Sequence, residues 1–172
     1  MTSPRPIIFL HGLQATPERS GSARAIRDAF SVRHAVITPD YLPLERSHVQ
    51  IEKFLGEIIS SNPGALLVGT SLGGYWAYRM SCVLPAELGL SCVLLNPYFY
   101  HYPEVGYFEH RPETAVTLLV NLDDDLIGPR DLIKRFEGRA RLIVSETGGH
   151  RFKDKTPIIN AVRQALQSSG EE

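Results

Sequence analysis

Apolar residues gather in six short runs that recur along the chain. Most of these runs are apolar throughout rather than at alternate positions, and they are rich in valine, isoleucine and leucine. Continuous apolar runs of this kind are typical of strands that are covered on both faces of a sheet. The predicted strands are residues 7–10, 35–38, 65–70, 91–96, 115–122 and 140–146.

Stretches with the spacing of amphipathic helices lie between these runs. In one of them the apolar residues from Val49 to Ile59 fall near one face, and Asn62, Pro63 and Gly64 end the pattern. The predicted helices are residues 22–30, 47–59, 73–84, 129–136 and 156–166. Strand alternating with helix predicts right-handed crossovers, and hence an α/β fold with a mostly parallel sheet of about six strands and helices on both faces.

Length and composition favour a single domain over residues 1–172, with a flexible tail at 168–172. With 43% hydrophobic and 22% charged residues, the chain resembles ordinary globular proteins rather than disordered ones. A formal net charge of -1, with both signs interleaved, argues against nucleic acid or an anionic membrane as a partner.

Cys82 and Cys92 form no CxxC pair and are too few for a disulfide framework, so we expect buried free thiols. The apolar run from Ile7 to Leu10 is too short for a signal peptide or a membrane span. A cytoplasmic location is therefore expected.

Ser71 stands in Gly69-Thr70-Ser71-Leu72-Gly73, a G-x-S-x-G pattern between a predicted strand and a predicted helix. A sharp strand-to-helix turn strains the serine backbone and crowds the positions two residues away on either side, where glycine fits. The turn would raise the Ser71 hydroxyl at the sheet edge, above a helix N-terminus that favours developing negative charge. Such a serine is a candidate nucleophile, and a tight packing turn is the alternative.

A serine nucleophile needs a base, and the base needs an acid that orients it. In strand-turn-helix hydrolases the acid and then the histidine follow the serine along the chain. His150 follows the last predicted strand in a loop with two glycines, so it is the candidate base. After the preceding strand come Asp123, Asp124 and Asp125, of which only one can point at His150; the other two are expected to be solvated turn residues.

The first predicted strand ends at His11-Gly12. There the N–H of Leu13 could pair with that of Leu72 to bind an oxyanion, while His11 is expected to anchor the loop. After Asn96 and Pro97 comes an aromatic segment, residues 98–113, at the same sheet edge. The segment concentrates Tyr98, Phe99, Tyr100, Tyr102, Tyr107 and Phe108, which would either line an acyl pocket or pack as a cap; Tyr98, Phe99 and Tyr102 are the candidate substrate-binding residues. The histidines and glutamates of this segment match no standard metal spacing, so no metal is expected.

The motifs "LHG", "GTSLGGYWA", "VLLNP", "LDDDL" and "GGHRF" occur in this order and with roughly the spacing of the small YqiA-like bacterial esterases. The chain thus resembles that family of the α/β-hydrolase superfamily over most of its length. The resemblance implies a compact hydrolase without a large lid, with Ser71 and His150 on the family motifs and Asp124 as the acid. The chain has Asp123 where the family tends to have glycine.

The expected function is therefore a serine hydrolase of the carboxylesterase type, which acts on small-molecule carboxylic esters or acyl thioesters through Ser71, His150 and Asp124. It would need no cofactor. A catalytically silent α/β-hydrolase fold that binds a small apolar ligand or a protein partner is the alternative, because fold does not determine function.

Overall fold

The structure is a computed structural model that describes residues 4–105 and 108–168. Within these residues, six parallel strands form one sheet in the order β2-β1-β3-β4-β5-β6. The strands are β1 Ile7–Leu10, β2 Val36–Ile37, β3 Leu66–Thr70, β4 Ser91–Leu95, β5 Ala115–Asn121 and β6 Arg141–Ser145. The expected flexible tail lies outside the described residues except for Ser168.

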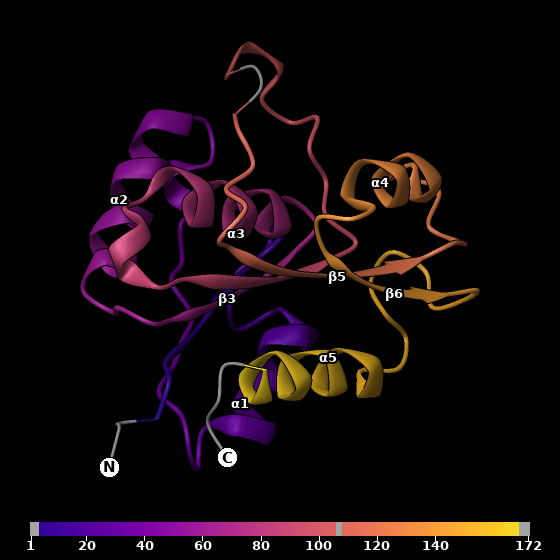
Figure 1. The fold of residues 1–172 in the computed structure, drawn as a ribbon, viewed down its shortest axis with the longest axis horizontal. Coiled ribbons are helices and arrows are strands. Elements are labelled where there is room, and N and C mark those ends of the chain that lie inside the picture. The colour runs from indigo at the N-terminus through magenta and orange to yellow at the C-terminus, as the bar shows by residue number, and fades with distance from the viewer. Residues whose placement is uncertain (1–3, 106–107, 169–172) are drawn as a thin grey trace.

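Five α-helices within the same residues cover the two faces of the sheet (Figure 1). They are α1 Gly21–Phe30, α2 His48–Ser60, α3 Leu72–Val83, α4 Pro129–Phe136 and α5 Thr156–Gln167. Helices α1 and α5 pack on one face, and α2, α3 and α4 pack on the other. Short 3-10 helices cover Leu42–Leu44, Ala86–Leu88 and Pro103–Val105.

The side chains of β1 alternate between the hydrophobic cores on the two faces of the sheet. Ile7 and Phe9 belong to the core beneath α1 and α5, whereas Ile8 and Leu10 belong to the core beneath α2 and α3. All four side chains are fully buried. Burial of a side chain of this size contributes about 1.5–3 kcal/mol, so a strand that is apolar at every position is stabilised on both faces. The predicted fold class is confirmed, although β2 contains only Val36 and Ile37 of the four predicted residues.

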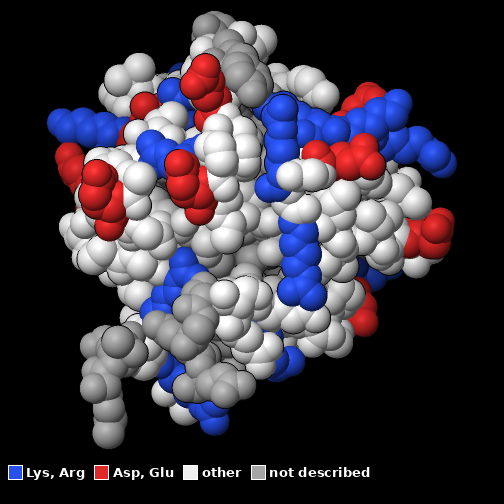
Figure 2. Space-filling model, in the orientation of Figure 1, with Lys and Arg blue, Asp and Glu red and all other residues white. Residues whose placement is uncertain are grey.

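Cys82 and Cys92 are both buried free thiols, as expected. Burial raises the pKa of Cys92 to about 12, which leaves this thiol protonated at neutral pH. Across the described part of the chain, every helix is too short or too polar to cross a membrane. Lys and Arg side chains are interspersed with Asp and Glu over the face seen in Figure 2.

The winding direction of the sheet changes between β1 and β3. The chain passes from β1 to β2 on one side and then returns to β3 on the other side of β1. In open α/β sheets, ligands bind beyond the carboxyl ends of the strands where the winding direction changes. Gly12 follows β1 and Ser71 follows β3, so both lie at this position.

Candidate active site

Ser71 occupies the sharp turn between β3 and α3. Its backbone has φ 54 and ψ -120, a strained conformation for a residue with a side chain. The main chain holds this conformation from several sides, because the Ser71 N–H donates to Leu95 O at 3.0 Å and Ser71 O accepts the N–H groups of Gly74 and Tyr98, each at 2.9 Å. The turn is therefore tied to both β4 and the segment that follows it.

The glycines around Ser71 are required by close packing of the main chain. A Cβ atom at Gly69 would lie 1.9 Å from the carbonyl oxygen of Gly73, a separation that no real side chain tolerates. A Cβ atom at Gly73 would lie 2.0 Å from the carbonyl oxygen of Leu10, so the prediction that only glycine fits two residues before and after the serine is confirmed.

Ser71, His150 and Asp124 form a hydrogen-bonded row. His150 Nε2 lies 2.9 Å from Ser71 Oγ, and His150 Nδ1 lies 2.6 Å from Asp124 Oδ2. Because an ionised carboxylate only accepts hydrogen bonds, Nδ1 carries the proton, and the lone pair of Nε2 faces the serine hydroxyl. Three side chains that are far apart in the sequence thus share the arrangement in which a histidine can take the proton of a serine.

Of the three adjacent aspartates, only Asp124 contacts His150 within the described residues. Its side chain is fully buried, and its second oxygen accepts the N–H of Leu126 at 2.9 Å, so both oxygens have fixed partners. Asp125 is exposed, as expected of a turn residue. For Asp123 the interpretation as a solvated turn residue needs correction. It is exposed, but its carboxylate also accepts two N–H groups of the His150 loop.

The N–H groups of Leu13 and Leu72 have no protein acceptor among residues 4–105 and 108–168. Leu72 is the first residue of α3, where N–H groups point out of the helix. Leu13 lies in a turn in which Ala15 N–H donates to Gly12 O at 3.2 Å. The carboxylate of Glu45 anchors this turn, because both of its oxygens accept the N–H of Gln14, at 3.1 and 2.9 Å.

Gly12 joins the two parts of this candidate oxyanion site. A Cβ atom on Gly12 would lie 3.4 Å from Ser71 Cβ, so the turn after β1 runs directly beside the serine. Leu13 and Leu72 therefore both adjoin the serine turn, and neither N–H group has a protein acceptor within the described residues.

His11 anchors the turn after β1 from inside the protein, as expected. Its ring stacks on Tyr41 at a centroid distance of 3.9 Å and is fully buried. Nε2 accepts the N–H of Tyr41 at 3.3 Å, so Nδ1 carries the proton that is donated to Gly12 O at 3.0 Å. Desolvation by burial lowers the pKa of His11, which keeps this neutral form.

The aromatic segment divides between buried and partly exposed rings. Tyr102 is buried, contacts the rings of His48 and Trp76, and donates its hydroxyl hydrogen to Glu45 O at 3.2 Å. Tyr98 and Phe99 are half-buried. Tyr102 therefore has the environment of a packing residue. The main-chain N–H of Tyr98, in contrast, donates to Ser71 O, which places Tyr98 beside the serine turn. Residues 106–107 of the segment lie outside the described residues.

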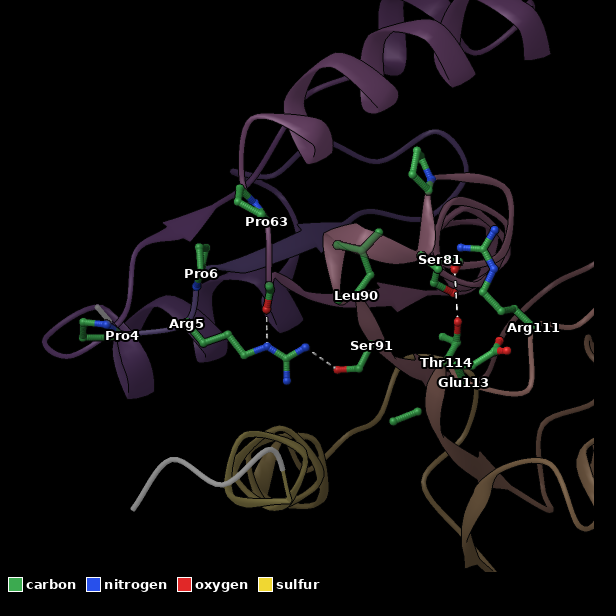
Figure 3. A pocket seen from close by; sticks show the side chains of 15 residues that line it. Pro4, Arg5, Pro6, Pro63, Ser81, Leu90, Ser91, Arg111, Glu113 and Thr114 are labelled. Carbon is green, nitrogen blue, oxygen red and sulfur yellow. Dashed lines mark hydrogen bonds between the residues drawn. The ribbon is translucent and has the colours of Figure 1, made fainter. Parts of the chain in front are cut away.

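The pocket in Figure 3 lies at the opposite end of the sheet from Ser71. Its volume is about 540 Å³, and residues that precede or begin strands line it, among them Arg5, Ser91 and Thr114. A second pocket of about 640 Å³ lies beside α2 and α3 and includes His48 and Arg79. Neither contains a member of the serine, histidine and aspartate row. Among the residues that the structure describes, no group of three or more histidine, cysteine or acidic side chains is arranged to hold a metal.

Sequence reasoning missed two buried asparagines behind His150. Asn96 follows β4 and Asn121 ends β5, and both side chains are almost completely buried. A polar residue directly after an apolar strand, at the sheet edge that carries Ser71, is a signal that could have identified them.

Comparisons with known proteins agree with the fold described above. A protein from Xanthomonas campestris pv. campestris, assigned to the α/β hydrolase superfamily, has a TM-score of 0.82 at 22% identity, covering 97% of this chain and 99% of that one. The Bacillus cereus carboxylesterase has a TM-score of 0.67 at 12% identity, covering 98% of this chain and 90% of that one. At such identities these likenesses establish the fold.

The sequence itself places the chain in a family. A UPF0227 protein of Shewanella baltica (strain OS155) is 30% identical over 112 residues, which are 62% of this chain and 59% of that protein. Residues 6–113 match the "Uncharacterised protein family (UPF0227)", which is the YqiA family. The resemblance inferred from the sequence motifs is confirmed, and the chain belongs to the UPF0227 family.

Proposed function

We propose that the protein is a serine hydrolase that cleaves carboxylic esters through an acyl-enzyme. The observation that carries this proposal is the hydrogen-bonded row of Ser71, His150 and Asp124, with 2.9 Å from Ser71 Oγ to His150 Nε2 and 2.6 Å from Nδ1 to Asp124 Oδ2. Ser71 is half-buried on a strained strand-to-helix turn, the position from which such a turn presents a hydroxyl to a substrate at the sheet edge.

In the first half of the reaction, Ser71 Oγ attacks the ester carbonyl carbon while His150 Nε2 takes the hydroxyl proton. The buried carboxylate of Asp124 stabilises the imidazolium that results and holds the ring in its productive tautomer. His150 then transfers the proton to the leaving alkoxide as the bond between carbon and oxygen breaks. The products of this half are an alcohol and an acyl group on Ser71.

Water completes the reaction by the same route. His150 takes a proton from the attacking water, the carboxylic acid leaves, and the proton returns to Ser71 Oγ. In both halves, negative charge develops on the former carbonyl oxygen. We assign its stabilisation to the N–H groups of Leu13 and Leu72, which have no acceptor in the described protein.

The relatives support the same class of chemistry. The Bacillus cereus protein, which is named a carboxylesterase, shares the fold over nearly the whole chain. Because the match to the Shewanella relative covers only 59% of that protein, the proposal depends on the site geometry.

A fluorophosphonate probe tests the proposal, because it phosphonylates only a serine that is activated by a base. We expect one adduct, mapped to Ser71 by mass spectrometry. It should be absent in Ser71→Ala and strongly reduced in His150→Ala. Ser61→Ala is the matched control, since the hydroxyl of Ser61 donates to Glu57 O on the exposed end of α2, and this variant should label like the wild type.

A folded wild type that takes up no probe would contradict the proposal. That result would favour the alternative, a silent fold that binds a small apolar ligand or a protein partner. A comparison of oxygen esters, acyl thioesters and amides of the same acyl group then identifies the bond that is cleaved, since the leaving group differs while the acyl-enzyme is the same.

A further inference from the structure

The loop that carries His150 is held by side chains from the two neighbouring strand ends. The loop connects β6 to α5 and spans residues 146–155, with Gly148 and Gly149 directly before His150. These glycines have φ 142 and φ 65, so the main chain reverses sharply just before the histidine. The imidazole can reach Ser71 and Asp124 only if this reversal is held in place.

Asn96 holds the loop through its side-chain amide. Its Oδ1 accepts the main-chain N–H of Asn121 at 2.9 Å, which fixes the orientation of the amide because a main-chain N–H can only donate. Nδ2 therefore faces the loop and donates to Gly149 O at 3.0 Å and to His150 O at 3.3 Å. Asn96 is fully buried and has φ 42, a left-handed conformation that asparagine tolerates better than most residues.

Asn121 provides a second donor to the same oxygen. Its Nδ2 donates to Gly149 O at 2.8 Å. The contact is close enough that a Cβ atom on Gly148 would lie 2.6 Å from the same Nδ2. The carbonyl of Gly149 thus points into a pair of buried amides, and the absence of a side chain at Gly148 permits this approach.

Asp123 binds the two main-chain N–H groups that directly precede this carbonyl along the loop. Its Oδ1 accepts the N–H of Gly149 at 2.8 Å, and its Oδ2 accepts the N–H of Gly148 at 3.2 Å. The carbonyl of Gly149 and the N–H groups of Gly148 and Gly149 are therefore all bound by side chains that follow β4, end β5 or lie in the turn after β5. That turn also carries Asp124. Two adjacent residues therefore bind the base, because Asp123 binds the main chain of the His150 loop and Asp124 binds the imidazole of His150.

We propose that Asn96, Asn121 and Asp123 are positioning residues, which hold the main chain at Gly148 and Gly149 so that His150 lies between Asp124 and Ser71. None of the three contacts the reacting atoms, and each acts through the loop. The inference rests on the proposed function, in which His150 must meet two partners at once. Displacement of a catalytic group by about 1 Å can lower a rate about 10²-fold.

Two substitutions separate this role from a general contribution to stability. Asn96→Asp retains the acceptor and the tolerance for φ 42 but replaces the donor to Gly149 O by an oxygen, which repels that carbonyl. Asp123→Ala removes both acceptors from an exposed residue and leaves the buried core intact. Asp123→Asn keeps one acceptor oxygen and should retain part of the function. Asn62→Ala is the control, because it removes a comparable amide hydrogen bond, to Ile58 O at 2.8 Å, at the far end of α2.

Two measurements are made on each variant: the rate of fluorophosphonate labelling, and the NMR signals of the imidazole nitrogens of His150. The His150 signals are identified as those that disappear in His150→Gln. We expect labelling to be about 10²-fold slower in Asn96→Asp and about tenfold slower in Asp123→Ala. Asp123→Asn should lie between Asp123→Ala and the wild type, and Asn62→Ala should match the wild type. The nitrogen signals of His150 should show loss of the single Nδ1-protonated tautomer in the slow variants only.

Wild-type labelling rates in Asn96→Asp and Asp123→Ala would overturn the inference. Slower labelling with unchanged His150 signals would overturn it too, since the loss would then arise elsewhere. If Asn96→Asp fails to fold, Asp123→Ala decides the question. A wild type that takes up no probe contradicts the proposed function, whereas the His150 signals measure positioning in either case.

Discussion

Gly73 lies directly against the main chain of Leu10. A Cβ atom at Gly73 would lie 2.0 Å from the carbonyl oxygen of Leu10, so the first turn of α3 touches the last residue of β1. This contact sets the separation between the turn that carries Ser71 and the turn that carries Leu13. The two N–H groups assigned to the oxyanion site therefore belong to elements in direct backbone contact.

Replacement of Gly73 by alanine should separate these elements. The added methyl group meets main-chain atoms that cannot rotate away, and overpacking of this kind costs about 1–3 kcal/mol or more. We expect a lower free energy of unfolding in urea, together with reduced fluorophosphonate labelling.

Gly56→Ala is the matched control for Gly73→Ala. Gly56 also lies within a helix, but a Cβ atom there would make only an ordinary contact, 3.7 Å from Met80 Cε. Because alanine is favoured over glycine in helices by about 1 kcal/mol, this variant should be slightly more stable than the wild type and label normally. Equal behaviour of the two variants would contradict the packing argument.

Asp124→Asn should lower kcat for an activated ester by roughly 10² to 10⁴. The amide can present its NH₂ group to His150 Nδ1, which favours the wrong tautomer. Asp125→Asn serves as the control, since Asp125 is an exposed residue of the same turn, and its kcat should change less than about tenfold. A large loss at Asp125 with none at Asp124 would show that the acid has been assigned incorrectly.

Tyr102 and Tyr98 should respond differently to truncation. Tyr102→Ala removes a buried ring and a hydroxyl bound to Glu45 O, so we expect a loss of about 3–5 kcal/mol in the free energy of unfolding. The ratios of kcat/KM across an ester series should remain unchanged. Tyr98 is half-buried beside the serine turn, and Tyr98→Ala should alter those ratios, because one or two lost methylene contacts are worth about 1–3 kcal/mol.

The reverse pattern, with altered ester ratios in Tyr102→Ala alone, would remove Tyr98 from the predicted substrate site. Thermal unfolding and ester kinetics measured on the same preparations distinguish these results.

His11 should make the protein less stable as the pH falls. Burial lowers the pKa of His11 in the folded state, while the unfolded residue titrates near its ordinary value of about 6.5. Below that pH the unfolded chain therefore binds more protons than the folded chain. The stability contributed by neutral His11 is present above about pH 6.5 and is lost as the pH falls toward the folded pKa.

Urea unfolding between about pH 8 and pH 5 measures this effect in the wild type and in His11→Gln. His110, whose pKa is also lowered, is retained in both proteins, so its contribution cancels in the comparison. The free energy of unfolding should fall more steeply with decreasing pH in the wild type. Parallel curves would show that protonation of His11 is tolerated in the folded protein.

The order of strands and helices along the chain was predictable because each element depends on local pattern. The run of Ile7 to Leu10 is apolar at every position, and the structure buries it on both faces. The exception is β2, where the pattern indicated residues 35–38 but pairing with β1 extends only over Val36 and Ile37. The length of a strand depends on its pairing with the neighbouring strand as well as on its own apolar run. A local sequence pattern does not reveal that pairing.

Ser71 and His150 could be identified from sequence because local motifs and chain order carry them, and glycine at Gly69 and Gly73 follows from the same turn. Asp124 was selected among three adjacent aspartates by family resemblance. The local sequence does not reveal in which direction each successive side chain of a turn points. In the structure the turn after β5 directs Asp124 inward to His150 and Asp123 toward the loop glycines.

Only the tertiary structure revealed the asparagines that hold the His150 loop. Asn96 and Asn121 are 25 residues apart, and Asn96 bonds to Gly149 across 53 residues. No local pattern links these positions, because each hydrogen bond requires one particular placement of β4, β5 and the loop after β6. The sequence by itself determined the elements, the serine turn and the order of the candidate chemical groups. Their distances, and the polar contacts that hold them, were decided by how the strands pair and which carboxyl ends meet at one edge of the sheet.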